Sequence, residues 1–215
     1  MAIYDTEEEQ VEALKRWWKE NGVSTIAGLA VGIVLILGWN YWRDYKKDQA
    51  AQASALYDQL LSAADTGNKE SAEKLAERAQ AEFGKTEYAL YSGLMEAKLK
   101  VQKSDLAAAK QILEELAAKS NDEVSHIARV RLVRLMLATG EYEQGLQVIN
   151  KVDPASSSGF SAIYDELLGD LYVALDRRDE ARTSYQNALR NGSQSPLLQF
   201  KIDDLTAPEI IQSQK

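Results

Sequence analysis

The sequence contains no cysteine, only three prolines and a single histidine among its 215 residues. The absence of cysteine excludes disulfides and thiolate metal sites, although it fits any cellular compartment. The histidine, His126, has no second histidine with which to share a metal, and we expect it to lie at the surface or to cap a helix. Scarce proline, together with windows rich in Ala, Leu, Glu and Lys, predicts an all-α protein.

The chain also lacks a basic patch. Lys and Arg number 25 against 33 Asp and Glu, which gives a formal net charge of −8 and a pI near 4.9. Nucleic acid is therefore not expected as a partner.

No motif of a metalloprotease, serine hydrolase, P-loop or dinucleotide-binding enzyme occurs in the sequence. The carboxylates are mixed with Lys and Arg, which is typical of solvated helix faces. We therefore predict a protein that is not an enzyme, with no catalytic, metal-binding or cofactor-binding residues. An enzyme with an unrecognised acid pair is the alternative, and a deep pocket lined by close carboxylates would indicate it.

One uncharged run, residues 21–42, interrupts this charged sequence. A helix of about 20 apolar residues matches the ~30 Å hydrocarbon core of a bilayer. The run is longer than the ~7–15 residues of a signal-peptide core, and bulky residues stand where a cleavage site needs small ones. Aromatic residues flank it, as at membrane–water interfaces: Trp17 and Trp18 before it, and Trp39, Tyr41 and Trp42 at its end. We therefore predict a retained transmembrane anchor over 23–42, in contact with the lipid bilayer.

The charges beside the anchor leave its orientation open. Three cations precede it and three follow it within the range that the positive-inside rule counts. They are Lys15, Arg16 and Lys19 on one side and Arg43, Lys46 and Lys47 on the other. A juxtamembrane segment, 43–50, then leads to the rest of the chain.

Residues 1–22 form a polar tail with a short amphipathic helix. A capping-box pair at Thr6 and Glu9 is followed by an apolar helix face, and Asn21-Gly22 supplies a stop. Two interpretations stay open here. Either a separate helix lies along the lipid headgroups, or the helix continues into the membrane.

Within the anchor, Ser24, Gly28 and Gly32 recur at every fourth position. Small residues at this spacing let a second helix approach closely, so we predict a candidate helix contact at these three residues. The alternative is that they have no such role, because glycine is common in membrane helices.

Beyond the anchor the sequence repeats. Four polar breaks are each followed, five positions on, by a small residue, and the small residues lie 37, 36 and 36 positions apart. The pairs are Gly67-Asn68 with Ala72, Ser104-Asp105 with Ala109, Gly140-Glu141 with Gly145, and Asp176-Arg177 with Ala181. This spacing predicts stacked helical hairpins, which bury a core only against their neighbours.

The last repeat follows the tetratricopeptide pattern most closely. Gly169 and Ala181 stand where small residues let the two helices of a hairpin close, and Tyr172 and Tyr185 would fill the space between those helices. After Pro196, a short amphipathic segment predicts a further helix that covers the exposed face of the last hairpin.

The predicted fold is therefore all-α: a single N-terminal transmembrane helix, then a tetratricopeptide-like α-solenoid of about four helical hairpins plus a capping helix. The repeat domain is expected over 51–205, and a flexible tail over 206–215.

Repeat proteins of this kind bind extended peptides or helices on their concave face. Transferring the tetratricopeptide positions to this chain predicts the residues that line that face, which come from the first helix of each unit. They are Tyr57, Leu61, Tyr91, Leu94, Lys98, Ile127, Val130, Arg134, Ile163, Glu166 and Asp170. This mixed lining suits weak capture of varied polypeptides. For each apolar residue the alternative is packing against a neighbouring hairpin.

Over nearly its full length, the chain resembles the YfgM family of bacterial inner-membrane proteins, ancillary subunits of the Sec translocon. The likeness lies in the tail EEEQVEALKRWWKENG, the anchor end GWNYW, the degenerate helical repeats and the closing SPLLQFKIDD. The resemblance implies a cytoplasmic N-terminus, a periplasmic repeat domain and association with the SecYEG translocon.

The same resemblance implies further partners. These are a PpiD-type periplasmic chaperone, exported client polypeptides that would be passed to periplasmic chaperones, and a cytoplasmic stress-response regulator that the short tail would contact. A cytoplasm-facing tetratricopeptide receptor, or an oligomerising scaffold with the same anchor, is the alternative.

Overall fold

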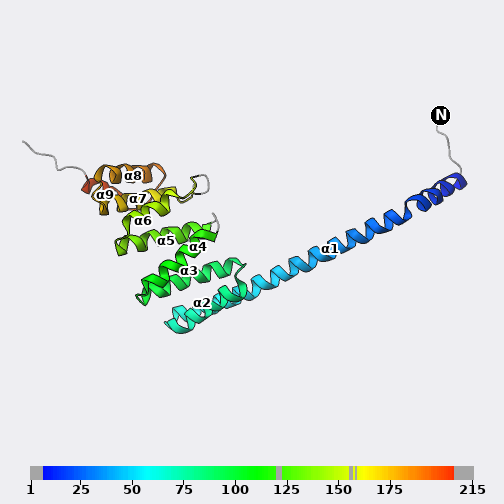
Figure 1. Ribbon diagram of the computed structural model, residues 1–215, viewed down its shortest axis with the longest axis horizontal. Coiled ribbons are helices and arrows are strands. Elements are labelled where there is room, and N and C mark those ends of the chain that lie inside the picture. The colour runs from blue at the N-terminus through cyan, green and yellow to red at the C-terminus, as the bar shows by residue number, and fades with distance from the viewer. Residues whose placement is uncertain (1–6, 120–122, 155–156, 158, 206–215) are drawn as a thin grey trace, which may run out of the picture. The chain divides into compact units, whose positions relative to one another are not determined.

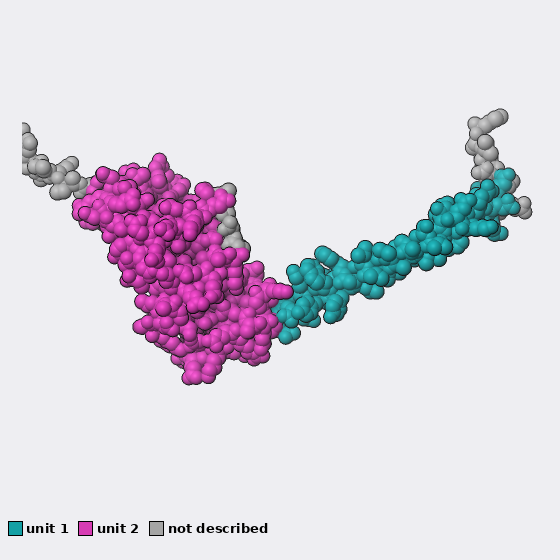
Figure 2. Space-filling view, viewed as in Figure 1, with its two compact units in different colours: residues 1–52 teal, residues 53–215 magenta. Residues whose placement is uncertain are grey.

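The computed structural model describes residues 7–119, 123–154, 157 and 159–205, and every regular element in those ranges is a helix (Figure 1). The helices are α1 (Glu7–Asp65), α2 (Lys69–Phe83), α3 (Glu87–Gln102), α4 (Leu106–Lys119), α5 (Glu123–Thr139), α6 (Tyr142–Asn150), α7 (Ser161–Ala174), α8 (Arg178–Arg190) and α9 (Leu198–Asp204). The chain divides into two units, residues 1–52 and 53–215, coloured separately in Figure 2. The all-α prediction is confirmed.

The first unit carries the apolar part of α1. Its large side chains, among them Ile26, Leu29 and Leu35, are exposed. Among the described residues, α1 is the one helix long and apolar enough to cross a membrane, and only 6% of its apolar stretch is buried within the protein. A large apolar surface that no protein covers suits a lipid environment.

The predicted stop at Asn21-Gly22 is wrong, because α1 runs through both residues. The Asn21 side-chain amide donates a hydrogen bond to the Trp17 carbonyl at 3.1 Å, and the Thr25 hydroxyl donates to the Asn21 carbonyl at 2.9 Å. Both polar side chains therefore bond within the helix instead of ending it. The structure therefore agrees with the interpretation in which the helix of the tail continues into the apolar stretch, and not with a separate helix before it. Thr6 lies outside the described residues.

Four tight turns join the helices of the second unit into hairpins, at the predicted breaks. Gly67, Ser104, Gly140 and Asp176 have φ angles of 76°, 62°, 80° and 56°, in the left-handed region. In each turn the N–H of the following residue donates to the carbonyl five positions earlier, at 2.8 to 2.9 Å. Such a bond satisfies a carbonyl that the ending helix leaves open. The predicted breaks and the four hairpins are confirmed.

The small residue of each unit lies where its helix meets neighbouring helices. Ala72, Ala109 and Ala181 have no exposed surface, and Gly145 is buried. Because each residue is small, the backbones approach closely and the larger side chains around them interdigitate.

The hydrophobic core is shared between neighbouring hairpins. One cluster joins α3 and α4 to α5, a second joins α5 and α6 to α7, and a third joins α8 to α9. In the third cluster Leu198 and Ile202 of α9, and Leu205 directly after it, are buried at 8% exposure or less. Burial of each side chain contributes about 1.5–3 kcal/mol. The predicted capping helix is confirmed, whereas the tail over 206–215 lies outside the described residues.

The expectation that His126 lies at the surface or caps a helix is wrong. Its side chain is 2% exposed, on α5. The ring stacks on Phe160 with centroids 5.0 Å apart, and Nδ1 lies 2.9 Å from the Tyr164 hydroxyl oxygen. His126 is thus part of the packing between α5 and the beginning of α7, a long-range contact that the local sequence does not reveal.

Gly169 allows the closest approach of two helices, α7 and α8. A Cβ atom at this position would lie 2.1 Å from Cε1 of Tyr185. The Tyr185 ring is 2% exposed, and its hydroxyl donates to Asp170 Oδ1 at 2.8 Å, so it cannot readily turn away. The predicted role of Gly169 in closing this hairpin is confirmed.

Replacement Gly169→Ala is therefore expected to lower the free energy of unfolding by about 1–2 kcal/mol. Overpacking costs about 1–3 kcal/mol, and the better helix propensity of alanine returns up to about 1 kcal/mol. Urea unfolding of the full chain in detergent, followed by far-ultraviolet circular dichroism, measures the change. Gly28→Ala is the control, because a Cβ there meets nothing within 4 Å. Equal stability of both variants would contradict the packing described.

Candidate protein-binding surface

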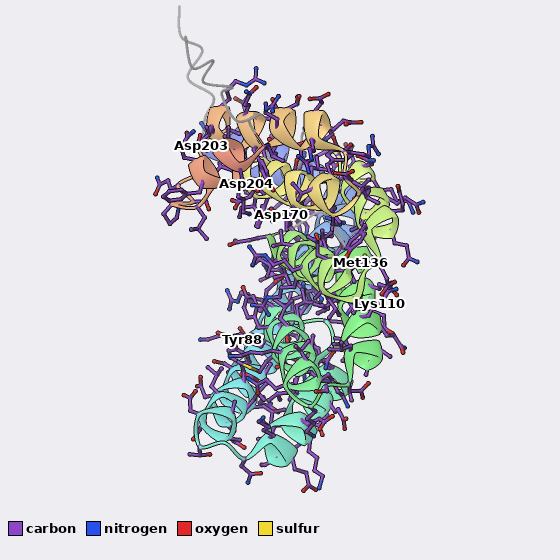
Figure 3. All side chains as sticks on the ribbon, turned by 90° about the vertical axis from the view of Figure 1, so that its left-hand side faces the viewer. Tyr88, Lys110, Met136, Asp170, Asp203 and Asp204 are labelled. Carbon is purple, nitrogen blue, oxygen red and sulfur yellow. The ribbon has the colours of Figure 1, made fainter. Side chains whose placement is uncertain are left out.

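The first helices of the four hairpins lie in a row within the second unit. They are residues 53–65 of α1, then α3, α5 and α7, and α5 contacts both α3 and α7. We call the face that these helices form the inner wall. Two open recesses lie along it, one toward each end of the domain, and Figure 3 labels Tyr88 and Asp170 near them.

The first recess, which we call the tyrosine recess, has a volume of about 280 Å³. Its lining comes from α1, α3 and α5 and consists of Tyr57, Tyr91, Leu94, Met95, Lys98, Ile127 and Arg131. Pockets for whole small molecules generally enclose about 300–1,000 Å³. The tyrosine recess is therefore of a size for one or two side chains of a partner.

Two tyrosines of the lining, Tyr57 and Tyr91, pack together with a third, Tyr88. The ring of Tyr57 lies 6.1 Å from the rings of both Tyr88 and Tyr91, and Tyr88 and Tyr91 meet edge-to-face at 6.3 Å. Burial, and then the neighbouring Tyr91, raise the pKa of Tyr57. Its hydroxyl therefore stays protonated at neutral pH and can interact with a partner only through hydrogen bonds. Tyr91 is 38% exposed, which presents an aromatic face to a partner.

The inner wall also carries three cations that form no ion pair among the described residues: Lys98, Arg131 and Arg134. All three side chains are exposed. Arg131 donates one hydrogen bond, to the Leu94 carbonyl at 3.1 Å. Arg131 and Arg134 are three positions apart on α5 and hence neighbours on its surface. The middle of the wall is therefore positive.

The second recess, which we call the lysine recess, has a volume of about 420 Å³. Its lining comes from α5, α7, α9 and the segment before α9, and consists of Arg134, Leu137, Ile163, Glu166, Leu167, Asp170, Ser195 and Lys201.

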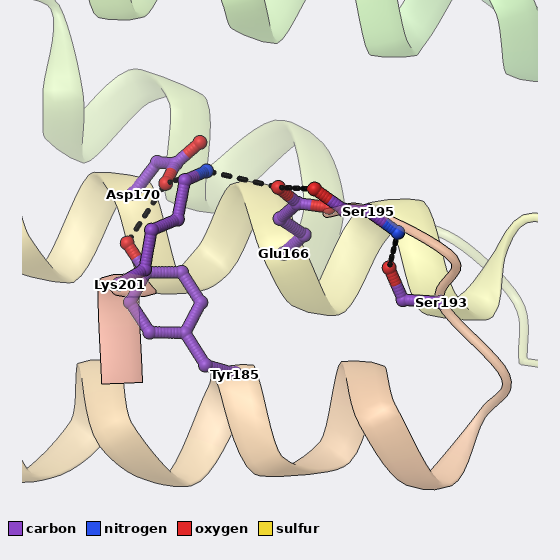
Figure 4. A network of polar contacts seen from close by, with 6 residues as sticks. All are labelled: Glu166, Asp170, Tyr185, Ser193, Ser195 and Lys201. Atoms are coloured by element: carbon purple, nitrogen blue, oxygen red, sulfur yellow. Dashed lines mark hydrogen bonds and ion pairs between the residues drawn. The ribbon is translucent and has the colours of Figure 1, made fainter. Parts of the chain in front are cut away.

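An ion-pair network crosses the lysine recess (Figure 4). The Lys201 ammonium lies 2.9 Å from Glu166 Oε1 and 2.7 Å from Asp170 Oδ1. The Tyr185 hydroxyl donates to Asp170 at 2.8 Å, and the Ser195 hydroxyl donates to Glu166 at 3.1 Å. The two ion pairs of Lys201 hold α9 against α7.

The pKa values of two of these groups are shifted. Burial alone would lower the pKa of Lys201, but its hydrogen bonds to Asp170 and Glu166 outweigh that effect and raise it. The pKa of the Tyr185 hydroxyl is raised, first by burial and then by its hydrogen bond to Asp170. At neutral pH Lys201 therefore keeps its charge and Tyr185 its proton.

Glu166 and Asp170 are the close carboxylates that the enzymatic alternative calls for, yet Lys201 bonds both. Their arrangement is that of a structural ion-pair network joining two helices. Among the described residues, no group of three or more His, Cys, Asp or Glu could hold a metal ion.

Nine of the eleven residues predicted for the concave face line the two recesses. Tyr57, Tyr91, Leu94, Lys98 and Ile127 line the tyrosine recess, and Arg134, Ile163, Glu166 and Asp170 line the lysine recess.

Leu61 and Val130 line neither recess. Leu61 is half-buried on α1. Val130 is 6% exposed and packs in the core cluster of α5, α6 and α7. Its tetratricopeptide position falls on the side of α5 that faces the next hairpin. Leu94 has the same exposure and packs in the cluster of α3, α4 and α5, although it also lines the tyrosine recess.

The sequence interpretation missed six lining residues: Met95, Arg131, Leu137, Leu167, Ser195 and Lys201. The first four lie beside predicted residues on the same helices, where helical spacing could have found them. Ser195 and Lys201 come from the capping region, and no local pattern predicts which recess it meets.

The small residues of the anchor remain a separate prediction. Ser24 and Gly28 are exposed, and a Cβ at Gly28 or Gly32 would meet nothing within 4 Å. This face of α1 is thus uncovered within the single chain.

The fold and the inner wall define a helical repeat protein of the tetratricopeptide class, joined to a helix of membrane-spanning character. A family model described as a tetratricopeptide repeat-like domain matches residues 15–207, and the chain belongs to that family.

Comparison with curated proteins identifies the family within the tetratricopeptide class more closely. The chain is 33% identical to the ancillary SecYEG translocon subunit of Haemophilus influenzae, over 95% of this chain and 100% of the relative. It is 29% identical to the protein of the same name from Escherichia coli, over 96% and 100%. A relative of that name from Neisseria gonorrhoeae is 24% identical over 95% and 100%. The chain therefore belongs to the YfgM family of ancillary SecYEG translocon subunits.

The ion-pair network generates a prediction about pH. Replacement Lys201→Met is expected to lower the free energy of unfolding by about 1–2 kcal/mol at neutral pH, because Glu166 and Asp170 lose their cation in a partly exposed site. A raised pKa means that the stabilisation by Lys201 is complete below its ordinary pKa of 10.5 and is lost as the pH rises through the raised value. The difference between wild type and variant should thus shrink above about pH 10.5.

Urea unfolding at a series of pH values measures this difference. Lys85→Met is the control, because Lys85 is exposed and forms no hydrogen bond or ion pair with the described residues. A difference for Lys201→Met that stays constant from neutral to alkaline pH would show that lost packing, and not lost charge, causes it.

Proposed function

We propose that this protein is a non-enzymatic scaffold that holds polypeptides on its inner wall beside the Sec translocon. The observation that carries the proposal is the gathering of aromatic, apolar and unpaired cationic side chains into an open recess along the first helices of successive hairpins. Exposed aromatic and Arg side chains over an apolar floor are the groups that dominate binding energy at protein interfaces.

The translocon enters the proposal through the relatives, each named an ancillary SecYEG translocon subunit. A single apolar helix would tether the chain in the inner membrane beside SecYEG. In this arrangement residues 1–22 are cytoplasmic, residues 23–42 cross the bilayer, and the repeat domain over 51–205 is periplasmic.

On the periplasmic side, the inner wall would take up newly exported client polypeptides and pass them to periplasmic chaperones, with a PpiD-type membrane-anchored chaperone as a neighbour. On the cytoplasmic side, the short tail would contact a stress-response regulator. The open form of both recesses supports brief capture, because a segment bound there would stay partly exposed to solvent.

Orientation is the first test. Alkaline phosphatase, which is active only outside the cytoplasm, is fused after Lys215, and we expect the fusion to be active in cells. A fusion after Glu20, ahead of the apolar stretch, is the inactive control. An inactive Lys215 fusion at normal expression would support the cytoplasm-facing receptor instead.

Capture by the inner wall is the second test. The double variant Tyr91→Ala/Arg134→Ala is expected to retain less than about a tenth of the co-purifying translocon and chaperone, because truncating two central interface residues commonly costs about 1–4 kcal/mol or more. Its urea unfolding should match wild type, since both side chains are exposed.

Leu189→Ala/Arg190→Ala is the matched control, because it removes an exposed apolar and an exposed cationic residue from α8, away from the inner wall. Normal co-purification with the inner-wall variant would count against the recesses as the binding surface.

A further inference from the structure

The charge of the inner wall contrasts with the charge of the chain. The sequence has a net charge of −8, and several cations of the repeat domain, among them Lys74, Lys100, Lys110 and Lys201, form ion pairs with carboxylates. Lys98, Arg131 and Arg134 are instead exposed on one wall, with no carboxylate within ion-pair distance among the described residues. Lys98 and Arg131 line the same recess, and Arg134 lies one helical turn from Arg131 on α5. Like charges placed in this way repel each other, and an anion between them would remove that repulsion.

The two recesses differ in the charge that they offer. In the lysine recess, Glu166 and Asp170 are both bonded to Lys201, so its acids and that cation satisfy each other. The lining of the tyrosine recess includes Lys98 and Arg131 and no carboxylate at all. Only the tyrosine recess therefore presents a net positive charge to an incoming ligand.

The apolar part of the tyrosine recess indicates that a negatively charged ligand would also carry an apolar side chain. Tyr57, Tyr91, Leu94, Met95 and Ile127 form the floor and edge, and about 280 Å³ admits an aromatic or branched side chain. Methionine adapts its shape to varied apolar partners. The cations lie beside this floor, on α3 and α5, so one ligand can bury an apolar side chain and place carboxylates on either helix.

We propose that the tyrosine recess binds an extended polypeptide segment in which Asp or Glu flank an aromatic or branched apolar side chain. This inference rests on the proposed function and deepens it, because it names the class of segment that the inner wall selects. The apolar side chain fills the recess, and its flanking carboxylates pair with Lys98 and Arg131, with Arg134 as the next cation along α5. Charge complementarity sets both specificity and the rate of encounter.

Peptide binding to the full chain in detergent tests this inference. The probe is a fluorescein-labelled peptide in which Glu and Asp alternate with Phe and Leu, and the matched peptide has Gln and Asn in place of the acids. Fluorescence anisotropy is expected to give about tenfold tighter binding of the acidic peptide, with an advantage that shrinks as salt is added. Equal affinity for the two peptides would overturn the inference.

A pair of charge reversals then locates the site. Lys98→Glu should abolish the preference for the acidic peptide, whereas Lys85→Glu, which changes the net charge equally on an exposed loop, should preserve it. If both variants lose the preference for the acidic peptide, or if neither does, the carboxylates of the peptide do not bind at the tyrosine recess. Self-association of the wild type that Lys98→Glu removes, or retention by phosphatidylglycerol nanodiscs that Lys98→Glu removes, would assign the recess to another occupant and overturn the inference.

The peptide-binding result and the co-purification result can be distinguished from each other. If Tyr91→Ala/Arg134→Ala loses its partners while the two peptides bind equally, the scaffold function stands and the charge selectivity fails. If the acidic peptide is preferred while that double variant co-purifies normally, the recess binds acidic segments without serving translocon or chaperone capture.

Discussion

Close contact between helices at small residues is the constraint on which the repeat domain depends. Ala72, Ala109 and Ala181 are fully buried, and a methyl group on Gly169 would overlap the Tyr185 ring. Because no hairpin carries a complete core of its own, the apolar clusters run from one hairpin to the next, and α9 must cover the last of them. A larger side chain at one of these contacts would displace a helix that belongs to two clusters at once.

The same arrangement produces the candidate binding surface. Stacking places the first helices side by side, so residues about 36 positions apart in sequence come to share one wall. Tyr57, Tyr91 and Ile127 meet in this way from three different helices. At the far end the Lys201 network bonds the capping helix and neutralises two acids, whereas nearer the first hairpin the cations of the wall stay unpaired. One stack of hairpins thus has two recesses of different charge: the carboxylates of the lysine recess are paired with Lys201, and the tyrosine recess has cations and no carboxylate in its lining.

Sequence periodicity predicts most of this architecture because the turns are local. A residue with a left-handed φ and the helices on either side leave their signature within a few positions, and all four breaks were predictable from Gly67, Ser104, Gly140 and Asp176. Long-range contacts are not predictable in that way. His126 is buried by Phe160 and Tyr164, and Lys201 reaches a recess formed mainly by α5 and α7. The stop expected at Asn21-Gly22 is wrong for a different reason: α1 continues through both residues, and the Asn21 side chain bonds to the Trp17 carbonyl of the same helix.

The central claim is that the inner wall, and not another face of the repeats, holds polypeptides. Site-specific photo-crosslinking in cells tests it most directly, with the photoreactive residue placed in turn at Tyr91, Arg134 and Ile163 on the inner wall and at Leu189 on α8. The account predicts crosslinks to other polypeptides from the three inner-wall positions and few from Leu189. Crosslinks from Leu189 alone, or equal crosslinking from all four positions, would contradict it.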